Sequence, residues 1–466
     1  MKFQIVLLWS DALFWLLLVA AIAFAWLVRR NQPLRAAWAK VGASRKAMAA
    51  ATLLAVFVLI ALLDSLHFRP QLPASADGKV VYGVEVHSLL DVALTPLRTR
   101  LEKTYSRPFA TRLYAKDNVE LADGSRIREY PRLKYGGVHL AAAEDAVAAD
   151  VIVTVLKGAA LAVLLWALLA GVLFGWLGHR QGMAAAWQQI WQKRRDGIAW
   201  DAVLAMLALI LLLLMPLVLL AGDYHVFGTD KVGQGVLYQI LKSVRTALVI
   251  GLVPTLVTLP LALLFGLLAG YFRGWIDDAI QYVYTVLSSI PGVLLIAAAV
   301  LMMQVVIDTH PGWFASAVER ADLRLLALCF ILGLTSWTGL CRLLRGETMK
   351  LRELEYVQAA QAFGVGHTGI LIRHILPNLM HIVIISVVMG FSSLVLSEAV
   401  LSYVGVGVDP NMISFGTMIN NARLELGREP VVWWGLAAAI FSMFVLVLAA
   451  NLFADVVRDA FDPRTA

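Results

Sequence analysis

Long uninterrupted apolar runs constrain this chain more than any other feature of its sequence. Two clear cases are LLAVFVLIALL over 53–63 and AMLALILLLLMPLVLL over 205–220. Only 15% of the residues are charged, whereas soluble domains carry about a quarter. The runs predict an all-α polytopic membrane protein, and they exclude a soluble enzyme and a disordered scaffold.

Nine segments are long enough to cross a bilayer. A helix needs about 20 apolar residues to span about 30 Å of hydrocarbon, where only helices and closed barrels satisfy their backbone. The predicted limits are 4–28, 48–63, 151–177, 202–221, 245–271, 281–306, 323–341, 381–403 and 431–455. We expect the first segment to be a retained helix rather than a signal peptide, because cleavage would leave the basic segment after it outside.

Basic residues between the predicted helices indicate the orientation. They concentrate in three segments, 29–47, 178–201 and 342–378, which lie on the same side if there are nine helices. By the positive-inside rule that side is the cytoplasm. The N-terminus is then outside the cell and the C-terminus is in the cytoplasm. Because the cations flank apolar spans, we expect membrane lipid and not nucleic acid as their partner.

One large polar segment, 64–150, separates the second and third predicted helices. It carries 12 basic and 12 acidic residues. VELADGSRIREY (119–130) indicates a hairpin around Asp123-Gly124, and KVVYGVEVH (79–87) alternates like a strand. We interpret the segment as a small external α+β insertion, with a loosely ordered loop as the alternative. The predicted regions are 1–63 (membrane helices), 64–150 (external), 151–222 (inserted helix pair) and 223–466 (core).

Residues for catalysis or metal binding are not apparent. The nine histidines fall in loops or at helix edges, and no HExxH or GxSxG occurs. Cys329 and Cys341 have no CxxC partner. We therefore expect no catalytic residue, no metal and no cofactor on this chain.

Glu398 is the ionisable residue of most interest within an apolar span. It lies in SSLVLSEAVLSYVGVGV and must face a partner, water or the bundle interior. A hydrogen-bonded structural carboxylate is one interpretation. A residue of a transport pathway is the other.

The stretch LRELEYVQAAQAFGVGHTGILIRHILPN (351–378) is too polar to span the membrane. From 352 to 363 it is typical of a short amphipathic helix, with Leu354, Val357 and Phe363 as apolar contacts. Gly364 and Gly366 end this helix, and a second piece over 368–376 is expected to end at Pro377. Such a helix either enters a groove on a soluble partner or lies on the surface as a linker.

This stretch resembles the EAA loop of ATP-binding-cassette (ABC) importer permeases. The matching residues are Gln358-Ala359-Ala360, Gly364 and Ile375-Leu376-Pro377. Gln358 departs from the Glu of the motif, so the salt bridge of that Glu is not expected. Further segments resemble the dipeptide/oligopeptide/nickel group, C-type subunit, over about 45–70 and 223–464. They are FGTDKVGQGVLYQILKSVRTALVIGL (227–252), GYFRGWIDDAIQYVYTVLSSIPGVLL (270–295), LSEAVLSYVGVGVDPNMISFGTMI (396–419) and NLFADVVRDAFDPR (451–464).

The resemblance implies a type I importer core and a set of partners. These are a second permease subunit (B-type), two ABC ATPases that bind ATP and Mg, and an external solute-binding protein. The chain has no P-loop, so it is not expected to be an enzyme. The implied ATPase contact is loop 346–378, through Glu353, Leu354, Glu355, Val357, Gln358, Ala359, Ala360, Phe363, Gly364 and Gly366.

The implied function is the permease subunit of an ATP-driven importer of peptides or similar small polar solutes. An ion-coupled secondary transporter acting without ATPases is the alternative, but it would need ligands for a coupling ion at mid-membrane. A scaffold whose external segment is the active part is a third. The sequence does not identify the transported solute.

Overall fold

The computed structural model describes residues 3–71, 82–83, 85–120, 126–140, 146–183, 197–314 and 316–462. The chain forms two compact units. Unit 1 comprises Met1–Val6, Asn31–Ala247 and Ile413–Val456. Unit 2 comprises Leu7–Arg30, Leu248–Met412 and Val457–Ala466.

Nine helical segments within the described ranges are long and apolar enough to cross a membrane, in agreement with the predicted number. Their mean hydropathy and length match the requirement for crossing hydrocarbon. They are Trp9–Arg30, Arg45–Asp64, Val147–His179, Trp200–Asp223, Val236–Phe272, Gly292–Thr309, Ala317–Arg352, His367–Val404 and Trp434–Phe461.

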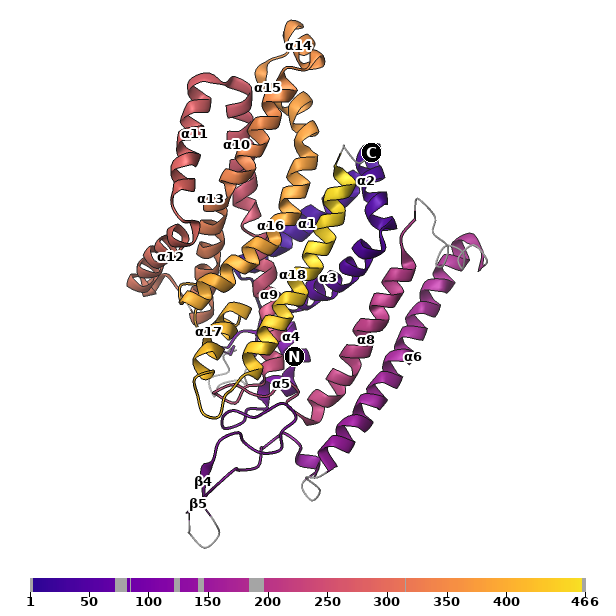
Figure 1. Ribbon diagram of the computed structural model, residues 1–466, viewed down its shortest axis with the longest axis vertical. Helices are drawn as coiled ribbons and strands as arrows, with labels where there is room; N and C mark the ends of the chain where they lie inside the picture. Colours follow the sequence, from indigo (N-terminus) through magenta and orange to yellow (C-terminus); the bar gives the residue numbers. More distant parts are fainter. Residues whose placement is uncertain are drawn as a thin grey trace. The chain divides into compact units, whose positions relative to one another are not determined.

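Unit 1 combines long helices with the small strands of the segment predicted to be external. Helices α6 and α8 run side by side as a hairpin (Figure 1). The helices of unit 1 are α2 (Gln32–Ala43), α3 (Arg45–Asp64), α4 (Leu89–Ala93), α5 (Thr95–Thr99), α6 (Val147–Gln181), α8 (Trp200–Asp223), most of α9 (Val236–Leu252), α17 (Phe415–Glu425) and most of α18 (Trp434–Phe461). A 3₁₀ turn covers Val138–Leu140.

Unit 2 is built from helices, and α10 and α13 form its most extensive contact. Its elements are α1 (Trp9–Arg30), α10 (Thr255–Phe272), α11 (Gly274–Ser289), α12 (Gly292–Thr309), a 3₁₀ turn (Pro311–Trp313), α13 (Ala317–Arg352), α14 (Glu355–Ala362), α15 (His367–Ile370), a π-helical turn (Leu371–Ile375) and α16 (Leu376–Val404).

The strands form two small antiparallel sheets. In the first, β1 (Phe3–Val6) pairs with β2 (His67–Pro70), which pairs with β3 (His87–Ser88). In the second, β4 (Asp117–Glu120) pairs with β5 (Arg126–Glu129), as the hairpin motif predicts, although its turn lies outside the described residues. Of the strand predicted over 79–87, residues 79–81 and 84 also lie outside them, and among the described residues of that range only His87 belongs to a strand, β3.

Several predicted helix limits are wrong. The fifth span starts at Val236 instead of 245, and the seventh covers Ala317–Arg352 instead of 323–341. Residues 3–6 form β1 instead of beginning the first helix, because their backbone pairs with β2. The sixth helix starts at Gly292 instead of 281, and the residues before it belong to α11. Pro291 separates the two helices, since a proline cannot donate the backbone hydrogen bond that a continuous helix needs.

Small residues allow α10 to approach α13 closely. A Cβ atom at Gly270 would lie 2.5 Å from Thr348 Cβ, and one at Gly266 would lie 2.8 Å from Leu344 Cβ. Both are closer than real Cβ contacts. The sequence GLLAG (266–270) is a small-xxx-small pattern, which permits close backbone contact between helices in membranes.

We predict that Gly270→Leu destabilises unit 2. The added side chain has no space against α13, and overpacking of this kind costs about 1–3 kcal/mol in the free energy of unfolding. Thermal denaturation of the purified chain in detergent should show the loss. Gly346→Leu on α13 is the matched control, because nothing lies within 4 Å of its Cβ position. Equal melting temperatures for the two variants would contradict the prediction.

Candidate functional site

The loop between α13 and α16 holds a short helix, α14, at one end of unit 2. Figure 1 shows α14 beyond the ends of α13 and α15. The helix covers Glu355–Ala362, which is narrower than the predicted 352–363 because α13 itself extends to Arg352. Gly364 follows with φ +77, a left-handed conformation that glycine adopts without strain and that reverses the chain after a helix.

The predicted end of the second helical piece at Pro377 is wrong. The chain passes through α15, the π-helical turn and α16 without a break. Pro377 lies in the first turn of α16, directly after the π-helical turn, where its missing N–H is tolerated. Asn378 Nδ2 donates to the carbonyl of His374 at 2.7 Å. The loop is thus continuous with a long membrane helix.

One face of α14 packs into unit 2. Val357 is 1% exposed and belongs to a buried cluster with Leu344, Ile370 and Ile375. Ala360 is also buried. These two predicted contact residues therefore hold α14 against the ends of α13 and α16 instead of presenting themselves to solvent.

The opposite side of the loop is apolar and exposed. Phe363 is 88% exposed, and Leu354, Tyr356 and Val365 are exposed as well. This loop lies outside the nine candidate spans, so lipid tails do not account for the exposure. Exposed apolar patches of this kind are typical of interaction surfaces in general.

Polar contacts fix the base of the loop. Arg273 Nη2 lies 2.6 Å from Glu353 Oε1, and Arg352 Nη1 donates to the carbonyl of Tyr271 at 2.5 Å. The hydroxyl of Tyr271 lies 2.9 Å from His367 Nδ1. Together these contacts tie both ends of the loop to the junction of α10 and α11.

Gln358 has a local role that the Glu of the motif could not perform. Its Nε2 donates to the carbonyl of Glu353 at 3.2 Å, next to the C-terminus of α13. A carboxylate has no donor for that bond. Glu355, Ala359 and Gly366, the remaining predicted contacts, are all exposed.

Glu398 is buried in the last part of α16. It is 2% exposed, and Ser402 Oγ donates to its Oε1 at 2.7 Å. The contact is one turn along the same helix. This geometry agrees with a hydrogen-bonded structural carboxylate, and a role in a pathway stays a prediction.

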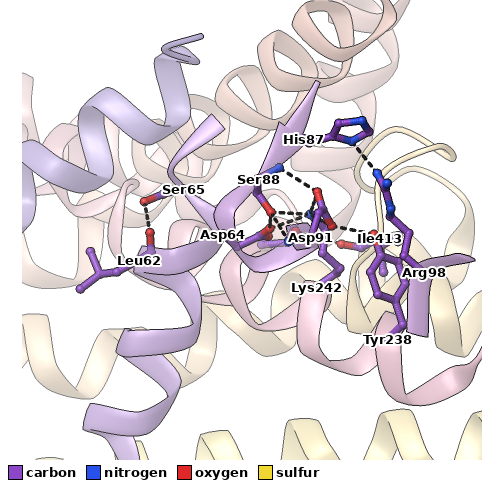
Figure 2. Close-up of polar contacts among 11 residues, drawn as sticks. Leu62, Asp64, Ser65, His87, Ser88, Asp91, Arg98, Tyr238, Lys242 and Ile413 are labelled. Carbon is purple, nitrogen blue, oxygen red and sulfur yellow. Dashed lines mark hydrogen bonds and ion pairs between the residues drawn. The ribbon is translucent and has the colours of Figure 1, made fainter. Parts of the chain in front are cut away.

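A buried ionic cluster in unit 1 was missed by the sequence analysis. Lys242 Nζ, on α9, lies 2.6 Å from Asp64 Oδ1 at the end of α3 and 3.1 Å from Asp91 Oδ1 in α4. Ser88 Oγ donates to Asp64, and Tyr238 donates to Asp91 at 2.8 Å (Figure 2). The three charged residues are up to 178 positions apart, and no local motif signals that they meet.

The charges of the cluster are mutually dependent. Burial alone would raise the pKa of Asp91, but the Lys242 ammonium and hydrogen bonds from Ser88 and Tyr238 outweigh it, so the pKa is lowered. At His87, burial and the neighbouring Arg98 both lower the pKa. Lys242 pairs with both buried carboxylates. Its loss would leave two buried negative charges close together without that cation.

A second buried carboxylate holds the segment after α5. Glu102 accepts backbone N–H bonds from Lys134 and Tyr135, each at 2.8 Å, and from Gly136. His225, just after α8, lies 3.2 Å away. Burial alone would raise the pKa of Glu102, but these hydrogen bonds lower it. Glu102 and the cluster around Lys242 thus anchor the polar segment to the ends of the membrane helices.

Nine candidate membrane spans in the described part of the chain, together with a short anchored helix in a loop, define the class of polytopic membrane subunits. A family model described as "Binding-protein-dependent transport system inner membrane component" matches residues 262–466. This range contains α11 to α18 and the whole α14 loop.

Several relatives match this chain over about half of its length. The glutathione transport system permease protein GsiD of Pectobacterium atrosepticum is 33% identical over 243 residues, which are 52% of this chain and 73% of the relative. The oligopeptide transport system permease protein OppC of Mycobacterium tuberculosis is 31% identical over 244 residues, 52% and 77% of the two chains. The peptidoglycan transport system permease protein YejE of Agrobacterium fabrum is 32% identical over 245 residues, 52% and 58%.

The chain therefore belongs to the binding-protein-dependent transport system inner membrane component family. It is a multi-pass inner-membrane permease subunit, as the EAA-like loop indicates. The comparisons support this interpretation and not a secondary carrier.

We predict that Lys242→Met reverses the pH dependence of stability of unit 1. In the native chain the lowered pKa of Asp91 makes a contribution that is present at neutral pH and lost as the pH falls below about 4. Without Lys242 two buried carboxylates remain unpaired, which costs about 3–5 kcal/mol at pH 7. Loss of the Lys242 ammonium leaves burial, which raises the pKa, as the largest influence on Asp91, so the variant regains stability as the pH falls.

Thermal denaturation at neutral and mildly acidic pH tests this. Adding Asp64→Asn to Lys242→Met should restore part of the loss at pH 7, because only one buried carboxylate then lacks a partner. A Lys242→Met variant with native stability at pH 7 would contradict the prediction.

Proposed function

We propose that this chain forms one half of the pathway of an ATP-driven importer and that α14 couples it to an ATPase. The observation that carries the proposal is the two-sided packing of α14. Val357 is held in the core of unit 2, whereas Phe363 is almost fully exposed. Force applied to the exposed side then moves α13 and α16 with it as a rigid body.

The partners proposed for the chain follow from its family. They are a second permease subunit, two ATPases and an external solute-binding protein. ATP and Mg bind to the ATPases, and no cofactor binds to this chain. The transported solute is a peptide or a similar small polar molecule, in keeping with relatives whose names specify glutathione, oligopeptide and dipeptide transport.

The proposed ATPase contact is the exposed side of the loop, Leu354, Tyr356, Phe363 and Val365. It extends to the exposed polar residues Glu353, Glu355, Gln358 and Ala359, and to Gly364 and Gly366, which shape the turn. Buried Val357 and Ala360 contribute by positioning the helix.

We predict that Phe363→Glu uncouples ATP hydrolysis from uptake. The side chain makes little contact within unit 2, so its replacement leaves folding intact but places a charge in an apolar interface. Solute-stimulated ATPase activity of the complex in nanodiscs should fall at least tenfold. Val232→Glu, also at an exposed apolar position, is the matched control. Native coupling in the Phe363 variant, assembled with its ATPases, would refute the proposed contact.

We further propose that the N-terminus lies outside and the C-terminus in the cytoplasm. The basic segments around 29–47 and 178–201 meet in unit 1, where Ala199 N donates to the carbonyl of Gly42 at 2.9 Å and Arg45 pairs with Asp201. Two of the three basic segments thus share one end of their helices, which supports the orientation by the positive-inside rule.

Cysteine labelling in intact cells tests the orientation. A membrane-impermeant maleimide should modify Val232→Cys without permeabilisation and Phe363→Cys only after it. Both native cysteines, Cys329 and Cys341, are buried, which keeps the background low. Labelling in the opposite order would overturn the orientation.

A further inference from the structure

The segment that precedes α6 carries a groove with a cationic and aromatic lining. Its volume is about 540 Å³. Arg107 and Arg112 are exposed along it, and aromatic rings of Phe109, Tyr114 and Tyr130 form its walls. The guanidinium of Arg107 lies over the ring of Tyr114, 4.6 Å from its centroid. Apart from Pro430, the residues that line the groove lie outside the range matched by the family model.

The segment that forms most of the groove is rich in basic residues. Although 64–150 is balanced overall, residues 98–134 contain ten basic and five acidic residues. Two of those acids are already engaged, Glu102 by backbone N–H groups and His225, and Asp117 by Lys103. Both charged residues of the groove lining, Arg107 and Arg112, are basic, so the groove itself presents positive charge. This does not conflict with an external location, because the positive-inside rule applies to short loops.

The groove is formed by two distant segments of unit 1. Pro430, from the connection between α17 and α18, lines it together with residues 107–114. Tyr114 donates to the carbonyl of Val431 at 3.0 Å and packs edge-on against Trp434, with ring centroids 4.9 Å apart. Phe109 adopts φ +57, a conformation unusual for a bulky residue, and its N–H donates to the carbonyl of His225. Backbone strain of this kind is found most often at functional sites.

We propose that this groove docks an acidic surface of the external solute-binding protein. The inference rests on the proposed function, which supplies such a partner. Three observations favour a protein over a small ligand. The groove is open, its lining extends along exposed chain rather than into a closed cavity, and arginine with tyrosine is the composition of interface hot spots. The positive field would accelerate association with an acidic partner.

A further consequence concerns signal transfer. The segment is tied to α9 by Lys242, Asp64 and Asp91 and to the loop after α8 by Glu102 and His225. A partner seated in the groove therefore contacts the inserted segment and the α17–α18 connection at once. Docking would be transmitted to helices of the core instead of being absorbed by a loose loop.

The test is the affinity of the assembled importer in nanodiscs for the solute-binding protein that stimulates its ATPase activity. Arg107→Glu with Arg112→Glu should raise the Kd at least tenfold at 50 mM salt, and the difference should shrink at 500 mM salt because the interaction is electrostatic. Arg107→Lys with Arg112→Lys keeps the charge and should retain most of the affinity. Lys231→Glu, an exposed cation outside the groove lining, is the control for net charge.

The outcomes separate this inference from the proposed function. A Kd within twofold of native in the double Glu variant, with unchanged assembly and basal ATPase activity, would overturn the docking site. Arginine-dependent binding of a triglutamate peptide to the permease, without an effect on the binding protein, would overturn it in favour of a small-ligand site. If the native chain assembles with no ATPase, the proposed function fails, while the measured affinity for the binding protein still decides the docking site.

Discussion

The absence of water from the bilayer interior is the constraint on which the rest of this structure depends. Backbone polar groups must be satisfied within each spanning segment, so the apolar runs become helices. Lipid tails are as apolar as leucine, so burial from water does not hold these helices together, and close packing takes its place. Gly266 and Gly270 show the consequence, since the backbone of α10 approaches α13 where a larger residue would collide.

At the ends of the membrane helices, ion pairs and hydrogen bonds hold the segments together, whereas close packing does so within the membrane. The segment between α3 and α6 has short strands and short helices that would not be stable alone. It is held by buried carboxylates, Asp64 and Asp91 around Lys242, and Glu102 beneath three backbone N–H groups. Each is paired or hydrogen-bonded, which offsets the cost of burying it. The result is a fixed platform at the ends of membrane helices.

The loop around α14, at one end of unit 2, is likewise held in place by contacts with the rest of its unit. A helix of eight residues is too short to be stable in isolation. Val357 in the core, the Arg273–Glu353 pair and the glycine turn at 364 hold it in place. Phe363 and its exposed neighbours are then presented on a rigid support, which is what mechanical coupling to a soluble partner needs.

The sequence by itself determined the number of membrane helices, the β4–β5 hairpin and the place of the α14 loop. Each depends on residues close together in the chain, namely apolar runs, an Asp-Gly turn and a spaced motif. Only the tertiary structure decided which side of α14 is buried, that Pro377 continues a helix, and that Lys242 meets Asp64 and Asp91. These depend on contacts between distant segments, and local periodicity carries no information about which distant side chain fills a given space.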